Sequence, residues 1–133
     1  MPHNFKNKMT EGIITDKAPL PIGPYSQAIV HGNYVWVSGC IALNAESGVM
    51  VQTSIEEETH TAMTNMKAIV EASGSSMAKI LKTTIFLTDM NQFAQVNSVY
   101  GQYLVSPYPA RETVQVSALP KGANVEISCV AFI

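Results

Sequence analysis

The chain has little charge and few residues of the types that build metal centres or disulfide frameworks. Of its 133 residues, 14% are charged, two are cysteine and three are histidine. The histidines are scattered and there is no Cys-x-x-Cys pair, so no metal-ligand spacing is visible and we expect no bound metal. Cys40 and Cys129 both fall in apolar, strand-like segments, which favours two reduced core thiols over a disulfide.

Long apolar runs and basic runs are absent as well. No segment approaches 18 consecutive apolar residues, so we expect no membrane-spanning helix. The net charge is −2 and the lysines are scattered, which argues against a nucleic-acid partner. Residues 1–10 lack the apolar core of a secretory signal and contain no arginine. We expect them to form a flexible tail on a cytoplasmic protein, with the mitochondrion as the alternative compartment.

Apolar residues make up 47% of the chain, which fits one domain with a real core over residues 11–133. The pattern predicts the element order β-β-β-α-β-α-β-β, an α+β fold in which two helices cover one face of a sheet. Strands are expected at residues 12–15, 26–30, 34–38 and 80–88, with the last two strands on either side of residues 119–122. In so short a chain, we expect another subunit to cover the other face.

The first helix is expected over residues 55–73. Ser54 and Glu57 form a capping box at its start, apolar residues recur at helical spacing, and Gly74 supplies a left-handed stop. Asp89 is expected to cap the second helix.

The inward face of the second helix is predicted to consist of Phe93, Val96, Asn97, Tyr100, Tyr103 and Leu104. Asn97 is a polar amide on this apolar stripe. From its position alone, a packing asparagine that bonds a loop carbonyl is favoured over a ligand contact.

Two short segments are candidates for lining a cleft. Residues 18–25 contain three prolines and a glycine, so they form an extended, ordered loop. This loop is either a rigid connector or a wall that presents Tyr25. Gly39, after a strongly strand-like run, allows close backbone approach of either a neighbouring strand or a ligand.

An arginine and a glutamate near the C-terminus are the strongest candidates for chemistry. On an extended strand Arg111 heads a polar stripe, while Val114 falls on the opposite, core-forming face. A guanidinium is a planar fork that grips a carboxylate, and Glu126 on the last strand could position water. We interpret the two residues as parts of a small-acid site.

The spacing of Arg111 and Glu126 excludes direct pairing in a simple hairpin. If the last two strands paired about a turn at residues 120–121, the two side chains would stand about 13 Å apart at about 3.3 Å per residue. The two side chains contact one ligand only if their strands are not neighbours in the sheet, or if the two residues come from different subunits. Taken alone, each residue favours a bland role: Arg111 in a surface salt bridge and Glu126 in solvent.

Six short motifs, in their order along the chain, resemble those of a known family. They are IGPYSQA (22–28), SG (38–39), NMKAIVEA (65–72), FAQVN (93–97), PAR (109–111) and NVEI (124–127). Each motif is weak by itself, but together they resemble the reactive intermediate deaminase family, the Rid or YjgF-type proteins. The resemblance runs from about residue 11 to 132, and the presence of both Arg111 and Glu126 resembles the archetypal deaminase subgroup.

The resemblance implies a fold, an assembly and an activity. The fold is chorismate-mutase-like, with a mixed six-stranded sheet whose last strand lies between earlier ones. The assembly is a homotrimer with clefts between subunits. The activity is cofactor-free hydrolysis of 2-imino or enamine acids, such as 2-iminobutanoate and 2-iminopropanoate, to 2-oxo acids and ammonium. This reaction protects pyridoxal-phosphate enzymes from damage.

The resemblance also implies the two catalytic roles. Arg111 would hold the substrate carboxylate through two parallel hydrogen bonds, and Glu126 would position and partly activate the attacking water.

Further substrate-binding residues carry over by motif: Tyr25, Ser38, Gly39, Asn97 and Thr113. Thr113 stands where many relatives have cysteine, so a thiol-dependent role is excluded. Cys40 stands where some relatives have glutamine, which bears on the preferred substrate size.

Two other functions compete with the deaminase. One is a non-enzymatic trimer that binds small carboxylates or acts as a chaperone-like regulator. The other is a ribonuclease or translation inhibitor, against which the net charge of −2 and the scattered lysines count.

Overall fold

The structure, a computed structural model, describes residues 10–133. The tail expected over residues 1–10 therefore lies outside the described residues except for Thr10. Thr10 is the first residue of the first strand, which begins two residues earlier than expected and ends at Ile13.

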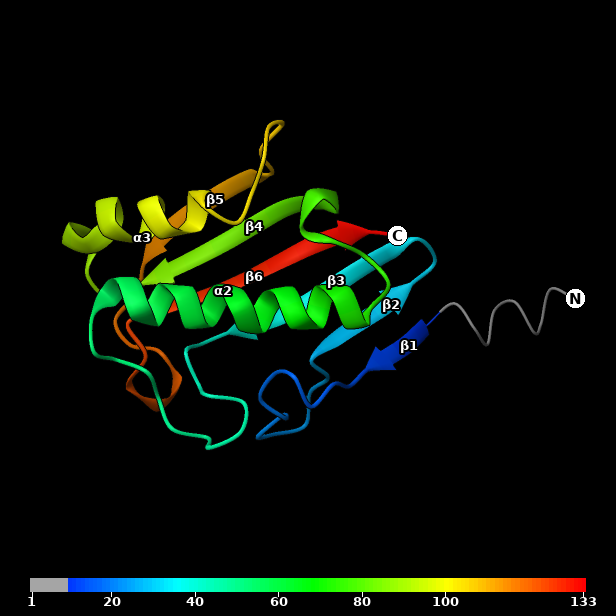
Figure 1. Ribbon diagram of the computed structural model, residues 1–133, viewed down its shortest axis with the longest axis horizontal. Coiled ribbons are helices and arrows are strands. Elements are labelled where there is room, and N and C mark those ends of the chain that lie inside the picture. The colour runs from blue at the N-terminus through cyan, green and yellow to red at the C-terminus, as the bar shows by residue number, and fades with distance from the viewer. Residues whose placement is uncertain (1–9) are drawn as a thin grey trace, which may run out of the picture.

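Six strands form one sheet with the order β1-β2-β3-β6-β4-β5 (Figure 1). Their bounds are β1 Thr10–Ile13, β2 Ala28–His31, β3 Tyr34–Cys40, β4 Ile80–Leu87, β5 Ala110–Gln115 and β6 Val125–Phe132. Among residues 10–133, β4 and β5 are the one pair of strands that runs in parallel. The predicted mixed six-stranded sheet is confirmed, with the last strand inside it. Because β6 pairs with β3 and β4, the last two strands form no hairpin.

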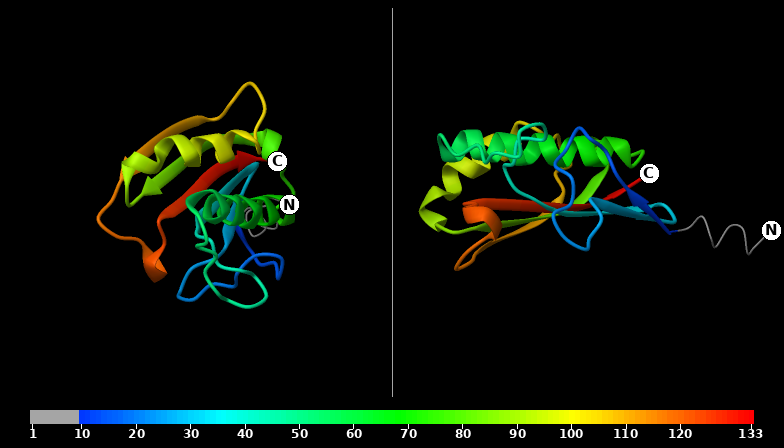
Figure 2. Two further views of the ribbon diagram at one scale, coloured as in Figure 1. Left: turned by 60° about the vertical axis from the view of Figure 1, so that its left-hand side comes forward. Right: turned by 90° about the horizontal axis from the view of Figure 1, so that it is seen from below.

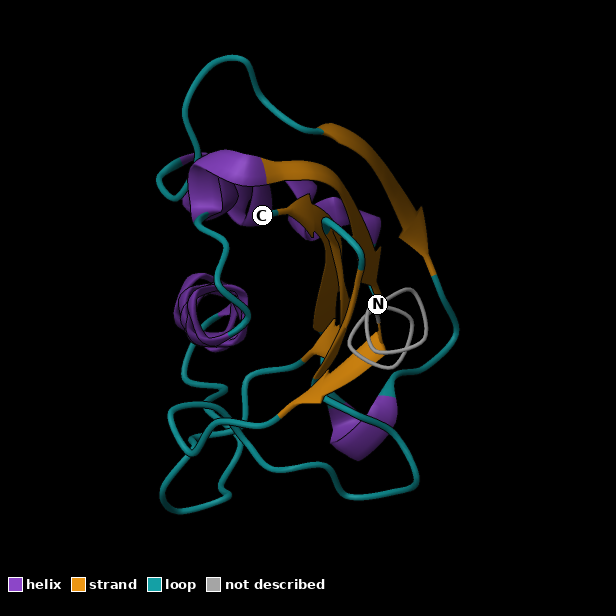
Figure 3. Ribbon diagram, turned by 90° about the vertical axis from the view of Figure 1, so that its right-hand side faces the viewer, coloured by secondary structure: helices purple, strands orange, loops and turns teal. Residues whose placement is uncertain are grey.

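Two α-helices, α2 (Ile55–Ala72) and α3 (Phe93–Gly101), lie on the same side of the sheet (Figures 2 and 3). The core fills the space between them and the sheet. Its fully buried side chains include Val35, Met63, Met66, Ile85, Leu87 and Ile127. Among residues 10–133 no α-helix lies on the other face, which we call the open face. There Tyr34, Trp36 and Val114 are about half exposed.

The α2 helix confirms the prediction for residues 55–73. The Ser54 hydroxyl accepts a hydrogen bond of 3.0 Å from the Glu57 amide, which satisfies one of the free amides of the first turn. The helix ends at Ala72, and Gly74 follows with φ +89, a conformation that glycine adopts without strain.

Three details of the second half differ from expectation. Asp89 caps a short 3₁₀ turn, η2 (Met90–Gln92), from which α3 then continues. Asn97 is exposed, and Val99 takes a buried place on the inward face instead. The expectation that Val114 faces the core is wrong, because the polar stripe of the edge strand β5 is the one that turns toward α3.

Both cysteines are buried free thiols, as the sequence predicts. Burial raises the pKa of the Cys129 thiol to about 12 and raises that of Cys40 as well. Within residues 10–133, neither helix combines the length and apolar content that crossing a lipid bilayer requires.

Candidate active site

The Arg111 guanidinium is held in place by one face of α3. Its central carbon lies 5.0 Å from the ring centroid of Tyr100 and 5.5 Å from that of Phe93. Its Nη1 donates a hydrogen bond of 2.6 Å to Asn97 Oδ1. Two aromatic faces and one amide oxygen therefore orient the planar fork.

The helical repeat explains why these three partners converge on one cation. Phe93, Asn97 and Tyr100 stand four and three residues apart, so they share one face of α3. The packing interpretation of Asn97, with a hydrogen bond to a loop carbonyl, is wrong, because Asn97 is exposed and its Oδ1 accepts the hydrogen bond from Arg111. Sequence reasoning treated Tyr100 as a core residue and missed its contact with Arg111.

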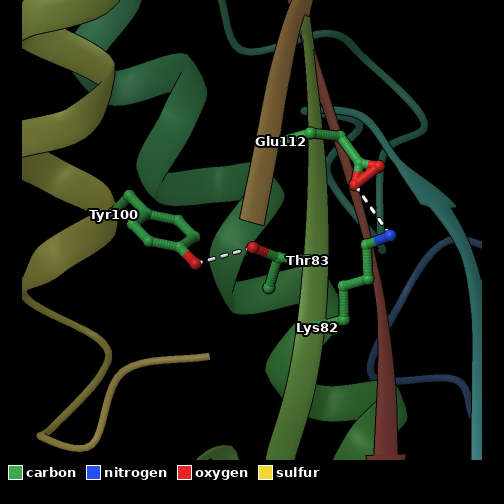
Figure 4. Close-up of polar contacts among 4 residues, drawn as sticks. All are labelled: Lys82, Thr83, Tyr100 and Glu112. Atoms are coloured by element: carbon green, nitrogen blue, oxygen red, sulfur yellow. Dashed lines mark hydrogen bonds and ion pairs between the residues drawn. The ribbon is translucent and has the colours of Figure 1, made fainter. Parts of the chain in front are cut away.

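Tyr100 is itself anchored to the sheet. Its hydroxyl shares a hydrogen bond of 2.6 Å with Thr83 Oγ1, and both side chains are buried (Figure 4). Burial raises the pKa of Tyr100, so the hydroxyl stays protonated at neutral pH. Thr83 is the β4 residue that stands opposite Arg111 in the parallel register.

Arg111 has donors left for a ligand. It lines a cavity of about 460 Å³ together with Asn97, Tyr100, Tyr108 and Pro109. In the described part of the chain, the one ion pair joins Lys82 to Glu112 at 2.9 Å (Figure 4), so the salt-bridge alternative for Arg111 is not realised. A guanidinium with five donors and one bonded amide oxygen can still bind a carboxylate.

Glu126 occupies a second, separate environment. On β6 it stands opposite Phe86 of β4, and it is half-buried rather than solvated. Burial raises the pKa of its carboxyl group. A Cβ on Gly39 would come within 2.6 Å of Glu126 Cδ and Oε2, so only glycine leaves the carboxylate where it lies.

The cavity beside Glu126 measures about 360 Å³. Tyr25, Ser38, Gly39 and Cys40 line it together with apolar side chains, which include Leu20, Ile22, Ile41, Leu43 and Ile69. The pairing of β3 with β6 is irregular in register between Val37 and Cys40. This irregularity places Ser38 and Gly39 beside the carboxylate of Glu126.

Gln27 organises this cavity and received no role from the sequence. It is 2% exposed. Its Nε2 donates a hydrogen bond of 2.8 Å to the Pro19 carbonyl and one of 3.0 Å to the Thr15 carbonyl. Its Oε1 accepts a hydrogen bond of 2.7 Å from the backbone amide of Thr15. These bonds hold the proline-rich loop that carries Tyr25. A buried glutamine next to a proline-rich segment is the signal that could have revealed it, since buried amides need partners.

The expected site residues thus fall into two groups. Tyr25, Ser38, Gly39 and Glu126 line one cavity, whereas Asn97 and Arg111 line the other. Thr113 lines neither, and its hydroxyl is buried with no hydrogen-bond partner in the described part of the chain. Among residues 10–133 there is also no cluster of three or more His, Cys, Asp or Glu that could hold a metal ion.

The chain is similar to known proteins over most of its length. Residues 15–133 match the model of a family described as endoribonuclease L-PSP. A 2-iminobutanoate/2-iminopropanoate deaminase from Dermatophagoides farinae is 48% identical over 121 residues, which cover 91% of this chain and 94% of that protein.

Solved structures agree in fold over nearly the whole chain. RidA from a Psychrobacter species superimposes with a TM-score of 0.89 at 41% identity, covering 92% of this chain and 99% of that one. Escherichia coli TdcF with bound serine gives a TM-score of 0.88 at 38% identity, covering 92% and 98%.

Proposed function

The chain belongs to the endoribonuclease L-PSP family, which contains the Rid and YjgF-type proteins, and on this premise we propose that it hydrolyses reactive 2-imino acids. The substrates are 2-iminobutanoate and 2-iminopropanoate, and the products are 2-oxo acids and ammonium. The proposal draws on the deaminase relative at 48% identity. Removal of such imines protects the pyridoxal-phosphate enzymes that release them.

The observation that carries the proposal is the Arg111 guanidinium, which Asn97 and Tyr100 hold in place and which forms no ion pair among residues 10–133. A 2-imino acid has a carboxylate next to its reactive carbon, so a bidentate grip on the carboxylate also places that carbon. The TdcF relative with bound serine supports a ligand of this kind, since serine carries the same carboxylate.

Glu126 is proposed to act on the attacking water. Its raised pKa brings the carboxylate closer to the working pH, where it accepts a proton more effectively. The water oxygen bonds to the imine carbon as the C=N electron pair moves to nitrogen, and the water proton passes to Glu126. Glu126 then returns this proton to the amine nitrogen of the carbinolamine. The C–N bond breaks with its electron pair going to nitrogen, the C=O bond forms, and the hydroxyl proton passes through Glu126 to the departing ammonia, which leaves as ammonium. A protonated imine is already electrophilic, so this chemistry needs no cofactor.

The arrangement of the two groups supports a shared site between copies of the chain. Arg111 and Glu126 line different cavities, so one small ligand reaches both only when two copies contribute. The half-exposed Trp36 and Val114 on the open face offer the apolar surface that such contacts bury. We propose a homotrimer in which Asn97, Arg111 and Thr113 of one copy face Tyr25, Ser38, Gly39 and Glu126 of the next.

The decisive experiment follows the decay of 2-iminobutanoate that a dehydratase generates in place, with purified wild type and variants. Arg111→Ala is expected to abolish turnover while the oligomer keeps its size in solution. Lys67→Ala is the matched control, because it removes one positive charge from an exposed position on α2. Wild-type turnover by Arg111→Ala would contradict the carboxylate grip.

Glu126→Gln separates the enzyme from a non-enzymatic carboxylate binder. An enzyme variant of this kind loses rate but still binds a 2-oxo acid, whereas a regulatory binder shows no imine turnover even as wild type. The family description also names an endoribonuclease. RNA cleavage that co-purifies with the protein and disappears in Arg111→Ala would favour that activity instead.

A further inference from the structure

A buried carboxylate on α2 has no part in the reaction described above. Glu58 is 1% exposed. Its Oε2 accepts a hydrogen bond of 2.7 Å from the backbone amide of Asn124, and its Oε1 accepts one of 2.8 Å from Asn124 Nδ2. Among residues 10–133 it forms no ion pair. A buried carboxylate without a cation is costly unless hydrogen bonds satisfy it, and here one residue supplies both donors.

Asn124 is also tied to Thr88, the residue that follows β4. Its carbonyl oxygen accepts a hydrogen bond of 3.1 Å from the Thr88 amide, and its Oδ1 accepts one of 3.4 Å from Thr88 Oγ1. Asn124 is therefore held from the helix layer by Glu58 and from the sheet by Thr88. It stands directly before β6, where the ladder with β4 begins at Leu87 and Val125.

The segment before Asn124 does not hold this position by regular structure. The 3₁₀ turn η3 (Pro120–Gly122) contains Lys121 at φ +56, an uncommon conformation for a residue with a side chain. Asn124 is thus a residue with fixed side-chain and backbone contacts directly before β6. Glu126 lies two residues further on, opposite Phe86, with its carboxylate against Gly39.

We propose that Glu58 is a positioning residue for Glu126: by clamping both donors of Asn124, it sets where β6 begins and hence where the catalytic carboxylate stands. The inference rests on the proposed function for its kinetic consequence, but the clamp itself is testable without activity. Two oxygens of Glu58 accept these bonds, whereas an amide in the same place would offer a single acceptor oxygen.

The test compares three variants with wild type. Glu58→Gln keeps the shape of the side chain but turns an NH₂ group toward a donor of Asn124. The double variant Glu58→Gln/Asn124→Asp restores the match, since the new amide donates to the new carboxylate and its oxygen accepts from the backbone amide. Glu56→Gln is the control, because it removes the same charge from an exposed position in the same turn.

Two measurements are made on each variant: kcat and KM for the imine, and hydrogen exchange of the amides of Asn124 and Glu126. For Glu58→Gln we expect kcat to fall about tenfold with KM within about twofold, because the water is misplaced while the Arg111 grip persists. We also expect faster exchange at both amides. The double variant should recover both properties, and Glu56→Gln should match wild type.

The outcomes separate this inference from the proposed function. Unchanged kcat and exchange in Glu58→Gln would overturn the positioning role, and so would a loss that the double variant does not restore. If wild type hydrolyses no imine, the proposed function fails, and the hydrogen-exchange data alone test the clamp. Slow exchange that is lost in Glu58→Gln and recovered in the double variant supports the clamp. Any other exchange pattern overturns it.

Discussion

Arg111 and Glu126 point to opposite faces of one sheet. Arg111 stands beside Thr83, whose side chain is fully buried against α3, and its guanidinium lies over the rings of that helix. Glu126 stands beside Phe86, three residues along β4 and therefore on the other face. The neighbours of Glu126 on β6, Val125 and Ile127, fill the core. In one copy of the chain, the two groups line different cavities.

Subunit complementation tests this relationship directly. Arg111→Ala alone should be inactive, and Glu126→Gln alone should keep only a low residual rate. When the two variants are co-expressed with different affinity tags, oligomers that contain both can be purified by using both tags in turn. These mixed oligomers should regain activity. In mixed copies of the proposed trimer, about a third of the clefts receive an intact Arg111 from one copy and an intact Glu126 from the next.

The matched control for complementation is Arg111→Ala co-expressed with the double variant Arg111→Ala/Glu126→Gln. This mixture contains no intact Arg111, so it should stay inactive. If the two single variants also stay inactive together while forming mixed oligomers, the cleft does not combine residues from two copies.

Gly39→Ala should damage catalysis and spare the fold. The added methyl group would lie 2.6 Å from Glu126 Cδ and Oε2, so the end of a flexible side chain moves rather than the backbone. A carboxylate displaced by about 1 Å costs up to about 100-fold in rate. We expect kcat to fall by at least about tenfold and the melting temperature to stay close to that of wild type. In the Glu126→Gln background, Gly39→Ala should have little further effect on kcat.

Two substitutions at Tyr100 should separate the hydroxyl from the ring. Tyr100→Phe leaves the buried Thr83 hydroxyl without its partner, which should lower the free energy of unfolding by about 1–3 kcal/mol. The ring under Arg111 remains, so KM should change little. Tyr100→Leu also removes the cation–π contact and should raise KM about 3- to 30-fold. Chemical denaturation and steady-state kinetics measure the two effects, and equal KM values for both variants would contradict the role of the ring.

The pH profile should report Glu126. A base must be ionised to accept the water proton, so activity should fall as the pH drops through the pKa of this group. Burial raises that pKa, so the acid limb of kcat/KM should lie above about 4.3, the ordinary value for glutamate. Glu126→Gln should leave a low residual rate without this limb. An acid limb at or below about 4.3 would show that burial does not raise the pKa of Glu126 in the working enzyme.

Local signals were enough to determine the helices and the identity of the chemical groups. Ser54, Gly74 and the apolar spacing between them set α2 almost to the residue, because caps and i→i−4 bonds involve near neighbours. The pairing of a guanidinium with a carboxylate as candidates also came from the sequence, since their chemistry belongs to the side chains themselves. So did their association with a family of known fold.

Only the tertiary structure decided which surfaces these groups face. The position of β6 between β3 and β4 joins segments far apart in the chain, and no local pattern specifies such a pairing. The same topology makes β5 an edge strand, so Val114 is exposed and Arg111 turns toward Phe93 and Tyr100. The clamp of Glu58 on Asn124 spans 66 positions of sequence for the same reason. Alternation along a strand predicts which side chains share a face, but the packing of the helices determines which face becomes the core.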